Sequence, residues 1–235
     1  MLFSIVVPCY NEKENIPLLL ERFSDCIGTR RNIELVIVDN GSTDGSGKLI
    51  DELLVGYPFA VKVTVPVNKG YGYGILSGLN AAKGDFLGWT HADLQTDPAD
   101  VIRAAAIIAK NGYDKNIYVK GNRKGRPAAD VFFTFGMSVL EMLLTNEWLE
   151  DINAQPNMFS RSFFEQWAEP PYDFSLDLYA YYMARKKRLR MIKFPVRFPE
   201  RIHGESKWNI NASAKIKFIK RTIDYSIRLT KKGVK

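Results

Sequence analysis

The first hundred residues alternate between two hydrophobic patterns. Short continuous apolar runs rich in β-branched residues predict buried strands at 3–8, 33–38, 61–65 and 85–88. Apolar residues spaced three and four positions apart predict amphipathic helices between them, at 12–27, 46–55, 72–82 and 98–111. Buried strands alternating with amphipathic helices are typical of a mostly parallel sheet covered on both faces, so we expect an α/β fold.

The second half of the chain follows a less regular pattern. Strands are predicted at 117–120, near 158 and at 190–196, and helices at 129–145 and 175–187. Neither an internal repeat nor a low-complexity linker interrupts the chain. We therefore expect one domain over residues 1–210, made of the halves 1–97 and 98–210, followed by a C-terminal segment at 211–235.

The C-terminal segment predicts an amphipathic helix over residues 211–231. Its apolar stripe contains Ile216, Ile219, Ile223 and Ile227, and lysines and arginines border this stripe. A wide apolar face with basic edges either packs on the domain or lies in a membrane interface. The sequence leaves both alternatives open.

The net charge of +7 is unevenly distributed along the chain. Residues 185–235 carry +14, whereas the remaining residues carry −7. A basic segment of this kind suits anionic lipid headgroups, a phosphorylated substrate or nucleic acid, or is simply a solvated surface. We do not expect nucleic acid, because Trp208, Phe218 and Tyr225 lie mostly on the apolar face and not among the cations.

Apolar runs and cysteines indicate the cellular compartment. The longest apolar runs are far shorter than a membrane span, and no signal peptide is recognised, so we expect a cytoplasmic protein. Cys9 and Cys26 are too few for a disulfide scaffold and are expected to be reduced core residues.

Polar loops follow the predicted strands at 9–12, 39–44, 68–72 and 90–97. The carboxyl ends of parallel strands are where open α/β sheets bind ligands. Asp93 and Gln95 offer oxygens to one cation, and a hard divalent ion neutralises a departing diphosphate. Asp39 is placed to accept a hydrogen bond from a ribose or base, whereas Asp44 or Thr43 is expected to cap the next helix.

The polar loops contain motifs that resemble those of a known enzyme family. The motifs Val7-Pro8-Cys9-Tyr10-Asn11-Glu12, residues 38–45, Asn68-Lys69-Gly70 and Ala92-Asp93-Leu94-Gln95 resemble, in order, the family 2 glycosyltransferases. Further on, Gly121-Asn122-Arg123, Asp151, and residues 159–161, 174–177 and 201–208 resemble the dolichol-phosphate mannose synthase and polyprenyl-phosphate glycosyltransferase branch. The resemblance covers residues 3–210.

The resemblance implies a GT-A fold and an enzymatic function. The expected reaction is inverting transfer of a sugar from a UDP- or GDP-sugar to a polyprenyl phosphate, by a protein bound peripherally at the inner face of a membrane. A sugar hydroxyl of a glycan or glycolipid is the alternative acceptor, and a non-catalytic nucleotide-binding protein is a further alternative. A nucleotidyltransferase is disfavoured, since no Gly-rich Arg loop follows the first strand.

The same resemblance assigns roles to individual residues. Residues 1–97 are the expected nucleotide-sugar half and 98–210 the acceptor half. The donor is expected to contact Pro8, Tyr10, Glu12, Asp39, Lys69, Gly70, Ala92 and Asp93. The metal ligands are expected to be His91, Asp93 and Gln95. Arg201 and Lys207 match basic residues that close over the diphosphate, Arg123 and Ser138 match acceptor positions, and Asp177 matches an acid that acts as base or orients the acceptor.

Two positions depart from the family pattern. His91 stands where the family has the first Asp of an Asp-x-Asp motif. A neutral imidazole ligates Mn²⁺, whereas the loss of one carboxylate weakens Mg²⁺ binding, so a divalent cation is expected but its identity stays open. Relatives carry an Arg shortly before Ser138, and residues 132–137 have none, so Arg126 is a candidate replacement. Whether the chain forms oligomers also stays open.

Overall fold

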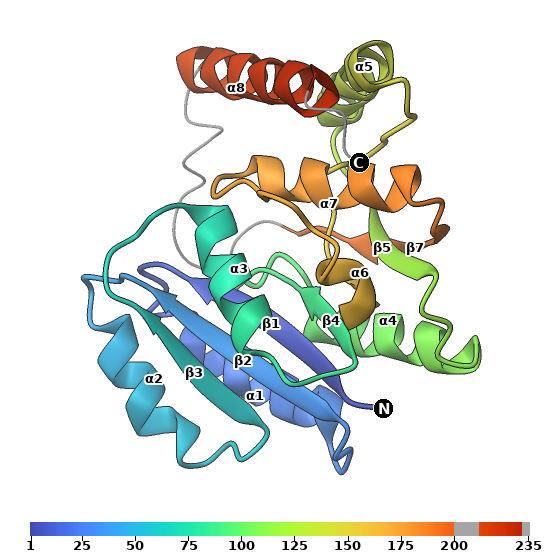
Figure 1. Ribbon diagram of the computed structural model, residues 1–235. Helices are drawn as coiled ribbons and strands as arrows, with labels where there is room; N and C mark the ends of the chain where they lie inside the picture. The colour runs from blue at the N-terminus through green and yellow to red at the C-terminus, as the bar shows by residue number, and fades with distance from the viewer. Residues whose placement is uncertain (200–211, 232–235) are drawn as a thin grey trace.

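A single mixed sheet organises the computed structural model, which describes residues 1–199 and 212–231, with the backbone alone at 128–130 and 212–218. Its strand order is β3-β2-β1-β4-β6-β5-β7 (Figure 1). The strands are β1 (Phe3–Cys9), β2 (Ile33–Asn40), β3 (Ala60–Val65), β4 (Phe86–Trp89), β5 (Ile117–Lys124), β6 (Asn157–Ser160) and β7 (Arg190–Arg197). Only β6 runs antiparallel to its neighbours in this part of the chain. The predicted mostly parallel sheet is therefore confirmed.

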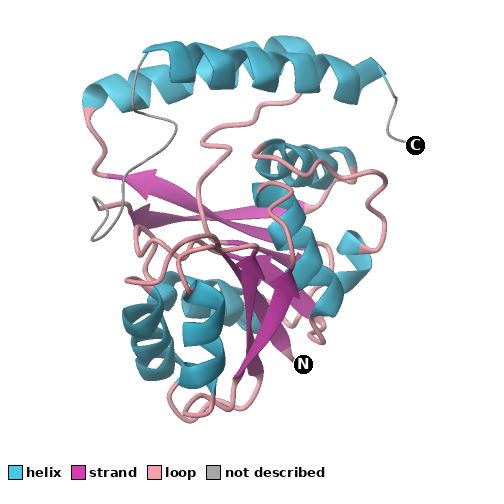
Figure 2. Ribbon diagram, turned by 90° about the vertical axis from the view of Figure 1, so that its left-hand side faces the viewer, coloured by secondary structure: helices cyan, strands magenta, loops and turns pink. Residues whose placement is uncertain are grey.

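Helices cover both faces of this sheet, as the alternating pattern predicts (Figures 1 and 2). One face packs against α1 (Ile16–Ile27), α2 (Ser46–Leu54) and α4 (Pro98–Lys110). The other packs against α3 (Tyr71–Ala81), α6 (Arg161–Phe164) and α7 (Ser175–Lys186). Beyond them lie α5 (Ala128–Thr145) and α8 (Ala212–Lys231).

Burial along the strands explains their composition. Every residue of β2 is buried, because β2 is paired on both edges and covered on both faces. Its odd and even residues divide between the two layers: Ile37 packs in the core under α1, and Val38 in the core under α3. The edge strand β3 is only partly buried. A continuous apolar run is thus the signature of a central parallel strand.

The strand order places a topological switch point between β1 and β4. The chain leaves β1 for β2 and β3 on one side, then returns to pair β4 with the other edge of β1. The loops after β1 and β4 consequently diverge at the same end of the sheet. A crevice for ligands forms at such a point in open α/β sheets.

Several sequence predictions differ from the structure in detail. Helix α1 begins at Ile16 instead of residue 12. The cap predicted at Asp44 or Thr43 is wrong, because Gly45 is the N-cap of α2, although the Asp44 carboxylate accepts a hydrogen bond from the Ser46 amide at 2.9 Å. Cys9 is buried as expected, whereas Cys26 is only partly buried.

The C-terminal helix packs on the protein. Helix α8 lies across α5 and also contacts α7, burying Thr222, Ser226 and Leu229 (Figure 1). The Ser226 hydroxyl donates to Glu141 Oε2 at 2.7 Å, and Glu141 is fully buried. Of the two alternatives left open for this helix, packing on the domain is the one observed. The division of the chain at residue 210 stays a prediction.

Among the helices that the structure describes, none combines the length and apolar character that crossing a bilayer requires.

Glu141 makes the packing of α5 and α8 sensitive to pH. Burial raises the pKa of Glu141 to about 7, and the Ser226 hydrogen bond only partly opposes this. Because this pKa is raised above its unfolded value, stability is highest with Glu141 protonated and falls as the pH rises toward 7. We expect Glu141→Gln to raise the free energy of unfolding at pH 8, by about 3 kcal/mol at most, and to change it little at pH 4.5. Denaturant unfolding at both pH values checks this, and an equal effect at both would contradict it.

Candidate active site

The loops that follow β1 and β2 are joined to each other by side-chain hydrogen bonds. Asn11 Oδ1 accepts from the Thr43 amide at 2.8 Å, and Ser46 Oγ accepts from the Glu12 amide at 3.1 Å. Tyr10 is 37% exposed above this junction. The segment from Pro8 to Glu12 is thereby held beside the loop after β2, and its contact with a ligand stays a prediction.

Asp39 is the second-last residue of β2 and is only 7% exposed. Its Oδ1 accepts a hydrogen bond from the Ser42 amide at 3.0 Å, which orients the carboxylate within the turn. The next residue, Asn40, donates through Nδ2 to the carbonyl of Gly70 at 3.0 Å. The loop after β3 is thus tied to the loop after β2.

Lys69 and Gly70 immediately precede α3, with Gly70 as its N-cap. Lys69 is exposed, with its Nζ 4.9 Å from the centre of the Tyr73 ring. Gly70 has φ +118°, and a Cβ there would collide with the carbonyl oxygen of Tyr172. The absence of a side chain therefore allows the loop that precedes α7 to reach the donor half of the protein.

The loop after β4 contains His91, Ala92, Asp93 and Gln95. The hydroxyls of Thr90 and Thr96 lie 2.7 Å apart and close the base of this loop. Asp93 is 5% exposed, and its Oδ1 accepts from the Gln95 amide at 3.1 Å. Gln95 Nε2 donates to the carbonyl of Pro199 at 3.1 Å.

The expected metal ligands form a small donor set. Within residues 1–199 and 212–231, no group of three or more His, Cys, Asp and Glu side chains is arranged to hold a metal ion. Asp93 supplies one carboxylate and His91 one imidazole, which are too few to bind a divalent ion alone. The set fits an ion that takes its remaining ligands from a diphosphate.

A stack of rings connects His91 to the segment that precedes α7. The His91 ring lies 5.9 Å from that of Tyr71, and the Tyr71 ring lies 4.5 Å from that of Phe174 at an interplanar angle of 10°. Phe174 immediately precedes α7. The position of His91 is therefore coupled to the start of the helix that carries Asp177.

Asp177 lies in the first turn of α7 and is 2% exposed. Asp177 is therefore a buried carboxyl and not an exposed charge at the start of a helix. Its Oδ1 accepts from Trp89 Nε1 at 3.1 Å and from Gln155 Nε2 at 2.7 Å. Burial raises the pKa of Asp177, while Lys120 and His91 oppose that shift. A buried carboxyl with a raised pKa is typical of functional sites.

Sequence reasoning missed the partners of Asp177. Trp89, Gln155 and Asn157 surround its carboxylate, and Lys120 lies beyond them. The sequence gives one indication of such partners, which is that polar residues lie within or at the ends of predicted buried strands. That signal does not specify which carboxylate they contact, because β4, β5 and β6 become neighbours only in the sheet.

The predicted acceptor residues lie in a separate cluster at the start of α5. Arg123 Nε donates a hydrogen bond to Asp151 Oδ1 at 2.8 Å. The same carboxylate oxygen lies 3.5 Å from Arg126 Nη2. Although burial raises the pKa of Asp151, Arg123 lowers it below its usual value overall. Arg126 Nη1 donates to Thr134 Oγ1 at 3.0 Å, and the Ser138 hydroxyl donates to the Thr134 carbonyl. Arg126 thus connects the Arg123 and Ser138 positions.

Two further predicted residues, Arg201 and Lys207, lie outside the described residues. Their contacts with the loops above stay predictions.

Comparison with known proteins identifies the family. The family model described as Glycosyl transferase family 2 matches residues 4–168. The chain belongs to this family. The matched region of the family 2 glycosyltransferase contains the four loops around β1 and β4 and ends before Asp177.

Curated relatives share part of the chain. The undecaprenyl-phosphate 4-deoxy-4-formamido-L-arabinose transferase of Pseudomonas fluorescens (strain Pf0-1) is 40% identical over 126 residues, covering 52% of this chain and 36% of that protein. The protein of the same name from Photorhabdus laumondii is 32% identical over 145 residues, covering 60% of this chain and 43% of that protein. This family 2 glycosyltransferase therefore spans less than half the length of these two relatives.

Solved structures share the fold. A mannosyltransferase from Pyrobaculum calidifontis in complex with GDP-Man and Mn²⁺ matches with a TM-score of 0.68 at 21% identity, over 96% of this chain and 64% of that one. Glucosyl-3-phosphoglycerate synthase from Mycobacterium tuberculosis in complex with Mn²⁺, UDP and glucosyl-3-phosphoglycerate matches with a TM-score of 0.68 at 18% identity, over 96% and 78%. The GT-A fold expected from the resemblance is confirmed.

Gly47 provides a test of Asp39 in this family 2 site. A Cβ at Gly47 would overlap Asp39 Oδ2, so Gly47→Ala is expected to displace the carboxylate. We expect the Kd for UDP or GDP to rise roughly tenfold, equivalent to about 1.4 kcal/mol. Gly56→Ala in the same region is the control, because its Cβ has no neighbour closer than 3.6 Å. Calorimetric titration measures both variants, and equal affinities would exclude Asp39 from nucleotide binding.

Proposed function

We propose that the protein transfers a sugar from a UDP- or GDP-sugar to a polyprenyl phosphate, with a divalent cation, at the cytoplasmic face of a membrane. The observation that carries this proposal is that the polar loops after β1, β2, β3 and β4 lie at one end of the sheet, with the switch point between β1 and β4, and that side-chain hydrogen bonds join the first three of them. Two buried carboxylates, Asp39 and Asp93, belong to these loops. Structural neighbours named as complexes with GDP-Man or UDP and Mn²⁺ support the donor and cation assignments.

The acceptor assignment is supported by the relatives and by the basic cluster at α5. The curated relatives are named as undecaprenyl-phosphate transferases. Arg123 and Arg126 share one carboxylate, Asp151, so the cluster keeps a net positive charge that suits a phosphate. In this proposal Arg126 takes the place of the Arg that relatives carry before Ser138.

The proposed reaction is an inverting displacement at the anomeric carbon. An acceptor oxygen forms the new bond as the bond to the nucleoside diphosphate breaks, so no covalent enzyme intermediate is required. Asp93, His91 and Gln95 would hold a cation that supplies electrostatic stabilisation to the departing diphosphate. Arg201 and Lys207 are proposed to add positive charge there. His91 in place of a carboxylate should favour Mn²⁺ over Mg²⁺.

Asp177 has a different role for each acceptor class. A phosphate acceptor is already anionic, so Asp177 would only orient neighbouring groups. A sugar hydroxyl must lose a proton, and Asp177 would accept it. The raised pKa of Asp177 favours this second candidate function, transfer to a sugar hydroxyl.

Sugar transfer by wild-type protein and Asp177→Asn, with Mn²⁺ present, tests the function and separates these acceptors. A panel of UDP- and GDP-sugars is offered with undecaprenyl phosphate or with a glycan acceptor, and the product is quantified by mass spectrometry. With the phosphate acceptor we expect Asp177→Asn to keep kcat within about threefold, because no proton is removed. A loss on the order of 10²- to 10⁴-fold would assign Asp177 as a base and favour the hydroxyl. Absence of transfer from every donor would contradict the proposed function and favour a non-catalytic protein.

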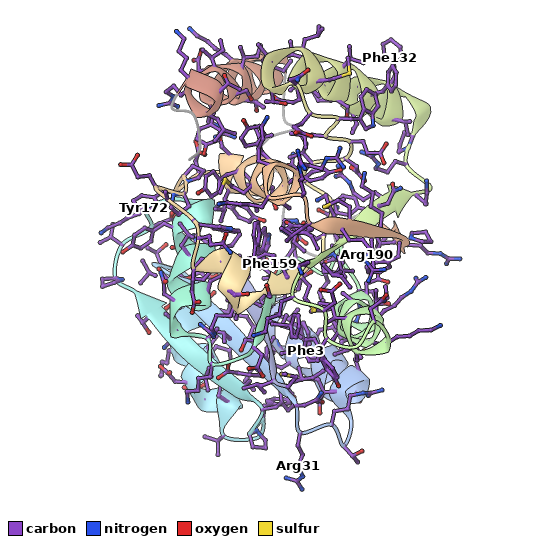
Figure 3. The ribbon with its side chains drawn as sticks, turned by 45° about the vertical axis from the view of Figure 1, so that its right-hand side comes forward. Phe3, Arg31, Phe132, Phe159, Tyr172 and Arg190 are labelled. Carbon is purple, nitrogen blue, oxygen red and sulfur yellow. The ribbon has the colours of Figure 1, made fainter. Side chains whose placement is uncertain are left out.

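We propose that the outer layer of α5 and α8 is the membrane-facing surface. Phe132 is 80% exposed and Leu143 is 73% exposed, both on α5 (Figure 3 shows Phe132 projecting outward, at the opposite end of the molecule from Arg31). Lys220 and Arg228 of α8, the helix that packs on α5, are exposed as well. Apolar side chains bordered by cations suit an anionic lipid surface.

Sedimentation with anionic vesicles tests this surface. We expect Phe132→Asp combined with Leu143→Asp to lower the vesicle-bound fraction of the protein at least about fivefold. The reason is that two apolar side chains that would enter the lipid surface are replaced by negative charges that anionic lipid repels. Val55→Asp is the control, since Val55 is 90% exposed but lies at the end of α2. Unaltered binding of the double variant would show that another part of the protein contacts lipid.

A further inference from the structure

Lys120 is a buried lysine within the sheet. It lies on β5 and is 1% exposed. Its ammonium donates to the carbonyls of Ile152 and Ala154 at 2.7 and 2.6 Å and to Asn157 Oδ1 at 3.2 Å. All three of its protons therefore have acceptors, so the group tolerates burial. Removing an ammonium from water is unfavourable even when its protons are hydrogen-bonded, so we examine which groups depend on this charge.

The acceptors of Lys120 lead to Asp177. Asn157 presents its oxygen to Lys120 and to the Tyr118 hydroxyl, so its amide nitrogen faces the other way. That nitrogen lies 2.9 Å from Gln155 Oε1 and 3.3 Å from Asp177 Oδ1. With its oxygen so engaged, Gln155 presents Nε2 to Asp177 at 2.7 Å. The Lys120 ammonium, together with the Tyr118 hydroxyl, thus orients the Asn157 amide and, through it, the Gln155 amide.

Lys120 also supports the turn that carries the acceptor cluster. The carbonyls that it binds, those of Ile152 and Ala154, follow directly after Asp151. Asp151 in turn pairs with Arg123. The ammonium therefore lies between Asp177 on one side and the Arg123–Asp151 pair on the other.

A second lysine provides a comparison. Lys193 of β7 is the register partner of Lys120, and both ammonium groups approach the Tyr181 ring, at 5.3 and 5.5 Å. Lys193, however, pairs with Glu150 at 2.7 Å. No hydrogen bond connects it to Asn157 or Gln155 in the described part of the chain. Two lysines of similar location thus differ in their connection to Asp177.

We propose that Lys120 is a positioning residue for sugar transfer, which orients Asn157 and Gln155 so that both amides donate to Asp177. This inference rests on the proposed function for its catalytic consequence. The hydrogen-bond relay itself is independent of the substrates.

The charges around Asp177 are consistent with this role. Burial lowers the pKa of Lys120 to about 8, while the carboxylates of Asp177 and Asp151 oppose the shift. The titratable groups that face Asp177 are Lys120, His91, Tyr71 and Tyr118. Of these, Lys120 opposes the rise in the Asp177 pKa most. Its removal should therefore raise the pKa of Asp177 further.

The kinetic test compares Lys120→Met with Lys193→Met. We expect Lys120→Met to lower kcat on the order of tenfold to a hundredfold, as expected for a misplaced reacting group, while the Kd for UDP or GDP stays within about twofold. Lys193→Met should keep kcat within about twofold of the wild type. A folded Lys120→Met protein with wild-type kcat would overturn the proposal. Equal losses in both variants would overturn it too, because they would indicate a merely structural effect.

A spectroscopic test needs no substrate. The indole N–H of Trp89 donates to Asp177, so its ¹H–¹⁵N resonance reports the charge and position of that carboxylate. We expect its pH midpoint to move upward in Lys120→Met and to stay unchanged in Lys193→Met. An unchanged midpoint in folded Lys120→Met would overturn the relay. If neither the wild type nor the variants transfer sugar, the proposed function is wrong. The pH titration of the Trp89 resonance still decides the role of Lys120 in that case.

The wild-type protein provides the measurement if Lys120→Met does not fold. Deprotonation of Lys120 near pH 8 removes its charge and weakens its hold on Asn157. We expect a second, alkaline step in the Trp89 resonance near that pH, in wild type and in Lys193→Met. A resonance without that step would overturn the proposal.

Discussion

The site depends on one close approach of two backbone segments. Gly70 lies against the carbonyl of Tyr172, where any side chain would collide, and the Tyr73 amide donates to the same carbonyl at 3.0 Å. This contact joins the start of α3, from the donor half, to the segment that leads into α7. The stack of Tyr71 on Phe174 and the placement of Asp177 beside Trp89 both follow from it. The contact therefore brings the loops after β2 and β3 close to the segment that leads to the buried carboxylate of Asp177.

The charged groups of the interior are paired around this junction. Asp177 accepts hydrogen bonds from amide and indole donors, with the Lys120 ammonium beyond them, and Asp151 lies beside two guanidinium groups. Removing a carboxylate from water is unfavourable unless donors replace the lost solvation. Both carboxylates meet this requirement through side chains from β4, β5 and the segment before β6. The sheet order, with β6 between β4 and β5, is what brings those donors together.

The outer layer of α5 and α8 differs from the sheet in which side chains it exposes. Its inner contact is partly polar, with Ser226 bonded to the buried Glu141, whereas its outer surface exposes Phe132 and Leu143. Exposed apolar side chains of this size, on a helix pair that also exposes the cations Lys220 and Arg228, suit an anionic lipid surface. They are the physical reason to assign the layer to a lipid boundary in the proposed function.

The sequence by itself determined the order of strands and helices, the parallel character of most of the sheet and the family. Continuous apolar runs such as residues 33–38 and motifs such as residues 92–95 depend only on local order along the chain. It also selected Asp39, Asp93 and Asp177 as site residues, and their roles stay predictions. It missed Lys120, Gln155 and Tyr71. The sequence around a lysine in a strand does not show whether the fold will place it near a carboxylate such as that of Asp177. Only the tertiary structure decided which donors meet Asp177 and that α8 packs on α5, since both depend on contacts between segments distant in the chain.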